Sequence, residues 1–156
     1  MSQMPWRFLD AGKIQLEVDG VPYRRGYGFP GDPTKGEYNN CLIDSLRQCL
    51  DNLECDCKAV RRDLELEFDE ALDNERRLVS RPSFLDIGYH WEAIMRSLLR
   101  HNTSHRSTAF NPEEYCIVGL DGNRPGHGVV FGRRNAPNRL VVVNWNDMHF
   151  DPCLRR

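Results

Sequence analysis

The stretch EYNNCLIDSLRQCL, residues 37–50, leads from a polar loop into a predicted amphipathic helix and places Cys41 at the junction. The apolar positions that follow are three and four residues apart, which predicts a helix with one buried face. Asn39 or Asn40 is expected to cap this helix, because an asparagine side chain can accept a bond from free N–H groups of the first turn. The sequence therefore predicts that Cys41 lies at a helix N-terminus.

A cysteine in this position can serve as a nucleophile. Only the thiolate attacks, and the partial positive charge and free N–H groups of a helix N-terminus favour the anion. Backbone N–H groups around Asn39 and Asn40 are expected to form an oxyanion hole for a tetrahedral intermediate. Such chemistry also requires a histidine to share the proton and a polar group to orient it.

The remainder of the chain predicts a single α+β domain over residues 1–156, in three parts. Residues 1–36 contain a hairpin around Asp19-Gly20, followed by a loop rich in glycine and proline. Residues 37–110 are helical, with further helices expected near 59–72 and 89–101. Residues 111–156 carry short β-branched runs separated by turns. We expect the helices to pack on one side of an antiparallel sheet.

Composition narrows the function classes. The net charge of −2 provides no basic excess for binding nucleic acid. No apolar run is long enough to span a membrane and no signal peptide is apparent, so the sequence favours action in a cytoplasm, such as that of a host cell after secretion or injection. The six cysteines are expected to be reduced, and neither a metal nor a cofactor is expected, because the cysteine spacings are not typical of a zinc site.

Two histidines near the C-terminus are candidate general bases. His149 follows the predicted strand RLVVVNW, residues 139–145, and has Asp151 two residues further on. His127 begins the preceding strand, with Asn144 or Asp147 as the polar partner. In either case the nucleophile begins a helix and the base comes from the sheet.

Two short motifs resemble the ovarian-tumour (OTU) family of cysteine peptidases, which belongs to the papain-like group. NNCLIDSL, residues 39–46, resembles the family's nucleophile motif D-G-N-C-L-F/I-x-A/S-L, and HFD, residues 149–151, resembles its H-Y/F-D/N base motif. The resemblance implies a papain-like fold with Cys41 as nucleophile, His149 as base and Asp151 as orienting group. The family commonly has an aspartate where this chain has Tyr38, so Asp151 would be the one orienting acid.

By resemblance, the implied substrate is ubiquitin or a ubiquitin-like protein, cleaved at an isopeptide bond by a compact domain such as those of bacterial effectors, toxins and viruses. A second hypothesis is a papain-like toxin that deamidates glutamine or cleaves a different protein. It would use Cys41, His127 and Asn144 or Asp147, since HGVVFG followed by Asn144-Trp145 resembles the Asn-x-Trp element of the papain group. A third hypothesis is an inactive ubiquitin-binding module.

Overall fold

A curled, mixed β-sheet forms the frame of the molecule in the computed structural model, which describes residues 2–68, 85–103 and 109–156. Within these residues the strand order is β1-β6-β5-β7-β8-β4-β3-β2. The N-terminal strands are β1 (Ser2–Gln3), β2 (Trp6–Phe8), β3 (Gln15–Val18) and β4 (Val21–Arg25). The C-terminal strands are β5 (Tyr115–Asp121), β6 (His127–Gly132), β7 (Asn138–Trp145) and β8 (His149–Arg155).

The α+β prediction is confirmed in its coarse form, but the sheet is not purely antiparallel. β5 and β7 run parallel, whereas the other neighbouring strands pair antiparallel. The connection from β6 returns the chain to the far side of β5, so β7 enters the sheet in the same direction as β5. The predicted hairpin around Asp19-Gly20 is β3 and β4, and β1 and β2 are additional strands.

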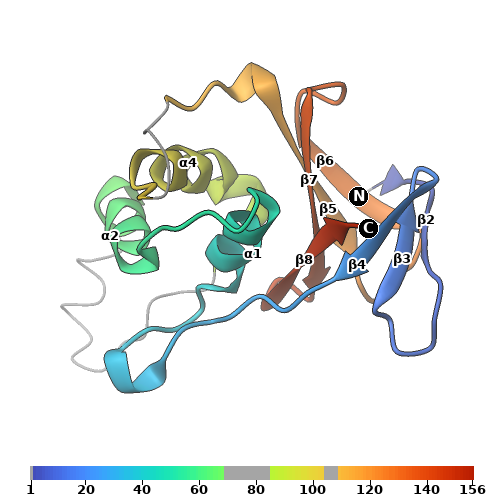
Figure 1. The fold of residues 1–156 in the computed structure, drawn as a ribbon, viewed down its shortest axis with the longest axis horizontal. Helices are drawn as coiled ribbons and strands as arrows, with labels where there is room; N and C mark the ends of the chain where they lie inside the picture. Colours follow the sequence, from blue (N-terminus) through green and yellow to red (C-terminus); the bar gives the residue numbers. More distant parts are fainter. Residues whose placement is uncertain (1, 69–84, 104–108) are drawn as a thin grey trace.

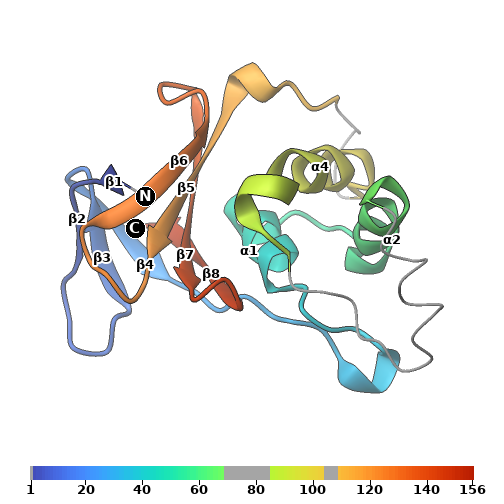
Figure 2. The ribbon, with the colours of Figure 1, turned by 180° about the vertical axis from the view of Figure 1, so that it is seen from behind.

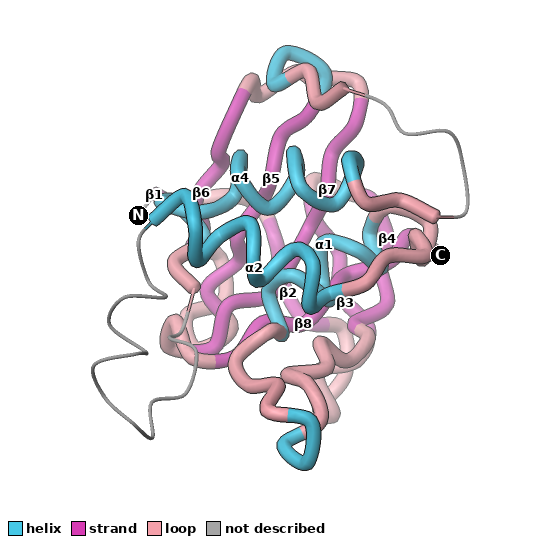
Figure 3. The backbone as a smooth tube through the Cα atoms, turned by 90° about the vertical axis from the view of Figure 1, so that its left-hand side faces the viewer, coloured by secondary structure: helices cyan, strands magenta, loops and turns pink. Residues whose placement is uncertain are grey.

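The helices cover one face of the sheet (Figures 1 and 2). They are α1 (Cys41–Cys49), α2 (Cys57–Phe68) and α4 (Ile87–Arg100) among the described residues, and Figure 3 shows them crossing in front of the strands. The expected helices near 59–72 and 89–101 correspond to α2 and α4. The part of the first of these predictions beyond residue 68 lies outside the described residues.

Alternating side chains on the central strands divide the apolar interior into two cores. In β7, Leu140 and Val142 face the helices, whereas Val141 and Val143 face the concave side closed by β2 and β3. β8 follows the same rule, because Phe150 packs with α1 in the helical core while Cys153 lies in the other. β8 therefore lies at the boundary of both cores, and α1 packs along it.

Candidate functional site

Cys41 is the first residue of α1, as expected from the sequence. The preceding loop makes its turn at Asn39, whose φ of 58° lies in the left-handed region that asparagine tolerates better than most residues. The buried guanidinium of Arg61 in α2 anchors this loop. It donates to the Asn40 side-chain oxygen at 2.9 Å and to the Asn39 carbonyl at 2.9 Å.

The asparagine cap prediction is wrong in its detail. Asn40 is the residue before α1, but its side chain accepts from Arg61 and makes no capping bond to the helix. Its own N–H donates to the Pro30 carbonyl at 3.0 Å. The Asn40 N–H is therefore not available to an oxyanion in this structure, contrary to expectation. Helix geometry leaves the Cys41 N–H without an intrahelical partner, so this group replaces it as a candidate donor.

The Cys41 thiol lies against the main chain of β8. Its Sγ is 3.8 Å from the Met148 carbonyl oxygen, to which the thiol donates. Burial raises the pKa of Cys41, while N–H groups of Phe150, Leu42 and Cys41 itself lower it and the charge of Asp151 raises it. The thiol therefore faces donors that stabilise a thiolate, in a setting that keeps it protonated at rest.

His149 and Asp151 form a hydrogen-bonded pair on one face of β8. His149 Nε2 is 2.7 Å from Asp151 Oδ1, which leaves Nδ1 as the ring nitrogen that can face a thiol. The Asp151 side chain is 2% exposed, whereas that of His149 is 32% exposed. The imidazole can thus meet a substrate while the carboxylate stays out of water. Within the described residues, no hydrogen bond joins the Cys41 thiol to the imidazole.

Residues 26–30, which we call the strap, pass between β8 and α1. On the β8 side, the Gly26 N–H donates to the Pro152 carbonyl at 2.8 Å and the Gly28 N–H donates to Asp151 Oδ1 at 2.9 Å. On the α1 side, the Phe29 N–H donates to Asp44 Oδ2 at 2.9 Å. The strap therefore joins α1, which begins with Cys41, to β8, which begins with His149.

Gly28 is required where the strap crosses the site. A Cβ at this position would lie 2.0 Å from the Phe150 carbonyl oxygen, 2.5 Å from Ser45 Oγ and 3.0 Å from the Cys41 carbonyl oxygen. The neighbouring Tyr27 side chain is exposed, and its ring lies 5.4 Å from the His149 ring. At Gly28 the strap thus packs closely against β8 and α1, and at Tyr27 it presents an aromatic ring to solvent beside the imidazole of His149.

The structure places the Cys41 thiol beside the main chain of Met148 and Phe150, which flank His149, and it separates this region from His127. His127 is on β6, three strands from β8 and so about 14 Å away across the sheet. Its carbonyl accepts from the Trp6 indole in a region formed by the N-terminal strands. His127 is not placed to take a proton from Cys41, which removes the basis for the alternative arrangement.

Asn144 and Asp147 instead stabilise the turn between β7 and β8. Asn144 Nδ2 donates to Asp147 Oδ1 at 2.7 Å, and the Asp147 N–H donates back to Asn144 Oδ1 at 2.7 Å. Asn146 and Asp147 have positive φ values of 60° and 57°, which this polar turn sequence tolerates. This turn sets where β8 begins, and hence the position of His149.

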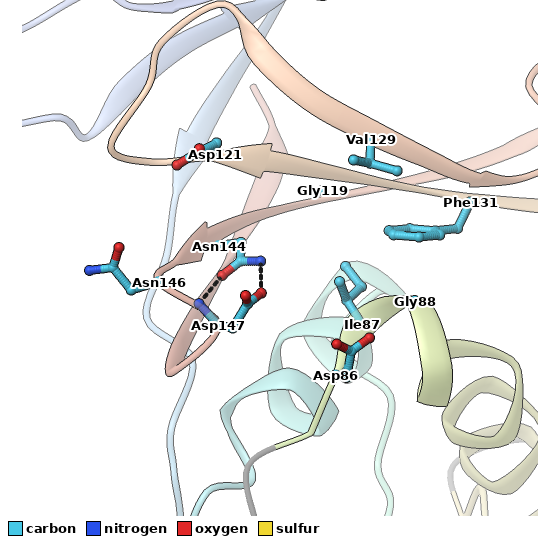
Figure 4. A pocket seen from close by; sticks show the side chains of 10 residues that line it. All are labelled: Asp86, Ile87, Gly88, Gly119, Asp121, Val129, Phe131, Asn144, Asn146 and Asp147. Atoms are coloured by element: carbon cyan, nitrogen blue, oxygen red, sulfur yellow. Dashed lines mark hydrogen bonds between the residues drawn. The ribbon is translucent and has the colours of Figure 1, made fainter. Parts of the chain in front are cut away.

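A cavity of about 450 Å³ adjoins this turn (Figure 4). Its apolar side includes Ile87 at the start of α4 and Phe131 on β6, and Asp147 lies at its edge. Asp147 is two residues from His149, so the cavity opens close to the site. Its volume lies in the range of pockets that hold small molecules.

Sequence reasoning missed Arg25 and Trp145, which also bind Asp151. Arg25 donates to Asp151 Oδ2 at 2.8 Å, and the Trp145 indole donates to the same oxygen at 3.0 Å. No local signal marks Arg25, because it lies 126 residues from its partner. Trp145 was visible as an aromatic residue at the end of a strand, but nothing in the sequence indicated its partner.

The described residues contain no group of three or more histidine, cysteine, aspartate or glutamate side chains able to hold a metal ion. The six cysteines are free thiols, and His101 is bonded to Asp63 at 2.9 Å. Among the described helices, none combines the length and apolar character needed to cross a membrane.

Comparisons of the chain with models of protein families, with curated proteins and with solved structures each found no match. The functional assignment therefore rests on the geometry of the site and on the two sequence motifs.

Proposed function

We propose that this chain is a cysteine-dependent hydrolase of the OTU type, with a papain-like fold, that cleaves isopeptide bonds of ubiquitin or a ubiquitin-like protein. One observation carries the proposal. The Cys41 thiol, at the start of α1, lies against the β8 main chain around His149, and the imidazole of His149 is bonded through Nε2 to buried Asp151. This combination supplies a nucleophile, a base and an orienting acid.

In the proposed reaction, the Cys41 thiol gives up its hydrogen bond to the Met148 carbonyl and donates instead to Nδ1 of His149, which takes its proton. The sulfur attacks the carbonyl carbon of the isopeptide bond and forms a tetrahedral oxyanion, which accepts a hydrogen bond from the Cys41 N–H. As the C–N bond breaks, His149 gives the proton to the leaving lysine amine and a thioester remains on Cys41. Water, deprotonated by His149, then attacks the thioester and releases a carboxylate and the free thiol.

Asp151 has a supporting role in both steps. Its hydrogen bond to Nε2 selects the ring orientation that directs Nδ1 away from the carboxylate, and its negative charge stabilises the imidazolium that forms. No aspartate stands at Tyr38 to share this role, so the substitution Asp151→Ala removes the orientation altogether.

The sequence motifs support ubiquitin or a relative as the substrate, and the surface near the site supports a protein substrate. Tyr27, Phe29 and Met148 are exposed large apolar side chains on the strap and beside His149. Apolar and aromatic groups around a nucleophile can hold an extended peptide segment in place. We place the activity in a cytoplasm, in the manner of an effector or toxin domain.

A second candidate function, binding of ubiquitin without catalysis, is favoured by one observation. Cys41 is 3% exposed and burial raises the pKa of its thiol. An inert thiol of this kind is the common state of a buried cysteine. The two candidates differ in whether Cys41 forms a covalent bond with an electrophile placed at the ubiquitin C-terminus.

The test is labelling with a ubiquitin probe that carries a C-terminal propargylamide, followed by intact-mass measurement. We expect a stoichiometric adduct with the wild-type chain, none with Cys41→Ala, and a rate reduced at least a hundredfold with His149→Ala. His127→Ala is the matched control and should label at the wild-type rate. Binding of ubiquitin without an adduct would favour the inactive module. Neither binding nor an adduct would shift the assignment to a deamidase or to another target protein.

A further inference from the structure

The Asp151 carboxylate is held by more donors than an orienting acid needs. Oδ1 accepts from the Gly28 N–H and lies 2.7 Å from His149 Nε2, and Oδ2 accepts from Arg25 Nη1 and the Trp145 indole. All four donor–acceptor distances lie between 2.7 and 3.0 Å. Both oxygens therefore have two partners each, and the carboxylate has no freedom to rotate away from His149.

Arg25 and Trp145 also hold each other. The Arg25 guanidinium lies 5.6 Å from the centre of the Trp145 ring, and its Nε donates to the Lys13 carbonyl at 2.7 Å. Guanidinium groups combine ion pairing with stacking on aromatic rings in this way. Because the ring and the main chain restrain it, Arg25 presents its Nη1 to Asp151 in one orientation.

We propose that Arg25 and Trp145 are positioning residues for the Cys41–His149 pair, with Arg25 also compensating the negative charge of Asp151 beside the thiol. This inference rests on the proposed function. Arg25 lies in β4, outside the two motifs, residues 39–46 and 149–151, that carry the resemblance to the OTU family, so the N-terminal hairpin is part of the proposed site. The contacts of Arg25 and Trp145 also explain how Asp151 alone can orient the imidazole in a chain that has Tyr38 where the OTU family commonly has an aspartate.

The electrostatic part follows from the signs of the charges. The charge of Asp151 opposes formation of a thiolate on Cys41, as the direction of its effect on the pKa of that thiol indicates. A guanidinium 2.8 Å from the carboxylate offsets this opposition. Other charged or titratable groups on the elements packed here include Lys13 over the Trp145 ring, Tyr27 on the strap, Asp44 and Arg47 on α1, Asp147 in the β7–β8 turn, and Cys153 on β8. The same elements also carry Tyr23 and Arg24 on β4, Cys49 on α1, Arg139 on β7 and Arg155 on β8.

Removing Arg25 removes one positive charge, which favours the protonated form of both members of the Cys41–His149 pair. The pH dependence of Cys41 reactivity should therefore move to higher pH. Removing the indole N–H alone changes no charge, so it should loosen Asp151 without moving this dependence. These two effects separate the compensating role from the orienting role.

The experiment measures alkylation of Cys41 by iodoacetamide from pH 5 to 9, with the rate at each cysteine read by peptide mass. The same variants are assayed on ubiquitin with a C-terminal aminocoumarin. Arg25→Gln should raise the midpoint of the pH dependence by about half a unit and lower kcat about tenfold, with KM within about twofold. Arg25→Lys should keep the wild-type midpoint. Trp145→Phe should lower kcat and leave the midpoint at the wild-type value.

The matched control is Arg24→Gln, which makes the same charge change on the exposed neighbour of Arg25 in β4 and should behave as wild type. A wild-type midpoint in Arg25→Gln, or an equal shift in Arg24→Gln, would overturn the inference. If kcat fell equally in Arg25→Gln and Arg25→Lys while the midpoint of the pH dependence stayed at the wild-type value, Arg25 would have only a structural role. That result would also overturn the inference.

Failure of the substrate proposal has a separate signature. Suppose that the chain does not cleave the ubiquitin substrate, but that the midpoint of Cys41 alkylation depends on His149 and moves in Arg25→Gln. This result supports the positioning role of Arg25 and rejects ubiquitin as the substrate. Alkylation of Cys41 that does not depend on His149 rejects the proposed site and this inference with it.

Discussion

Cys41 and Cys57 each begin a helix, α1 and α2, and they differ in what faces the thiol. The Cys41 thiol lies against the β8 main chain, where N–H groups of Phe150 and Leu42 lower its pKa against the effect of burial. Burial raises the pKa of Cys57 to about 11, and the charge of Asp44 adds to this effect. A helix N-terminus alone therefore does not prepare a cysteine for catalysis.

The difference originates outside both helices. Cys41 has β8 beside it, which brings the Phe150 N–H and His149 from more than a hundred positions later in the chain, and the strap lies alongside. The charged neighbours of Cys57 are mainly acidic and local, with Asp56 directly before it. The strongest tests of this comparison change one junction and leave the other untouched.

The largest effect is expected from Gly28→Ala, which disturbs the Cys41 junction alone. The added Cβ would meet the Phe150 carbonyl at 2.0 Å, so the strap must move, at a cost of about 3 kcal/mol in the free energy of unfolding. Urea unfolding measures this cost. Gly12→Ala is the control, because its Cβ would meet only side-chain atoms, at 3.4 Å or more. Wild-type stability in Gly28→Ala would show that the strap does not pack closely on β8.

A smaller effect is expected in the selectivity of alkylation. At pH 7.5 we expect iodoacetamide to modify Cys41 at least about tenfold faster than Cys57, because His149 can accept the proton from Cys41. His149→Ala should remove this preference and leave the rate at Cys57 unchanged. Peptide mass resolves the two sites. Faster modification of Cys57 than of Cys41 in the wild type would reverse the comparison.

The smallest effect concerns the far end of α1, where burial raises the pKa of Cys49 to about 12. The folded chain then retains this proton after the unfolded chain has lost it, so its contribution to stability is complete below about pH 9 and is lost as pH rises toward 12. Between pH 9 and 10 the loss is about 1 kcal/mol.

The measurement is the free energy of unfolding of Cys49→Ala against pH, relative to its own value at pH 7. We expect it to fall about 1 kcal/mol less than that of the wild type between pH 9 and 10. Val60→Ala removes buried carbon without a titrating group and should lower stability evenly across this range. A Cys49→Ala curve parallel to the wild type would show that this thiol titrates normally.

The helices and most strands could be predicted because their signals are local. The spacing of apolar residues located α1, and β-branched runs between turns located β5, β6 and β7. The sequence HFDPCLR of β8 has no β-branched residue, so this strand carried no such signal. The parallel pairing of β5 with β7 could not be predicted, because it depends on which side of β5 receives β7. That choice is made by packing between strands rather than by any residue in the turn.

The site divides in the same manner. Cys41, His149 and Asp151 could be named as candidates because each lies in a short motif, and the structure places the Cys41 thiol against the main chain that flanks His149. The donors around them were not, since Arg25 and Gly28 meet Asp151 across more than 120 residues of sequence. The Asn40 prediction was wrong because buried Arg61, from another helix, takes the side chain that would otherwise cap α1.

The contacts that Asp151 makes with the strap and with Arg25 have a consequence for the order in which the candidate site assembles during folding. The Gly28–Asp151 bond and the Arg25–Asp151 ion pair close loops of more than 120 residues, and contacts of such long range form late in folding. α1 can form from local contacts alone, whereas Asp151 meets its partners in β4 and the strap only once β4 and β8 have paired. A chain in which α1 has formed but β4 and β8 have not paired would therefore have Cys41 at its helix terminus without Asp151 held nearby, so these candidate residues come together late in folding.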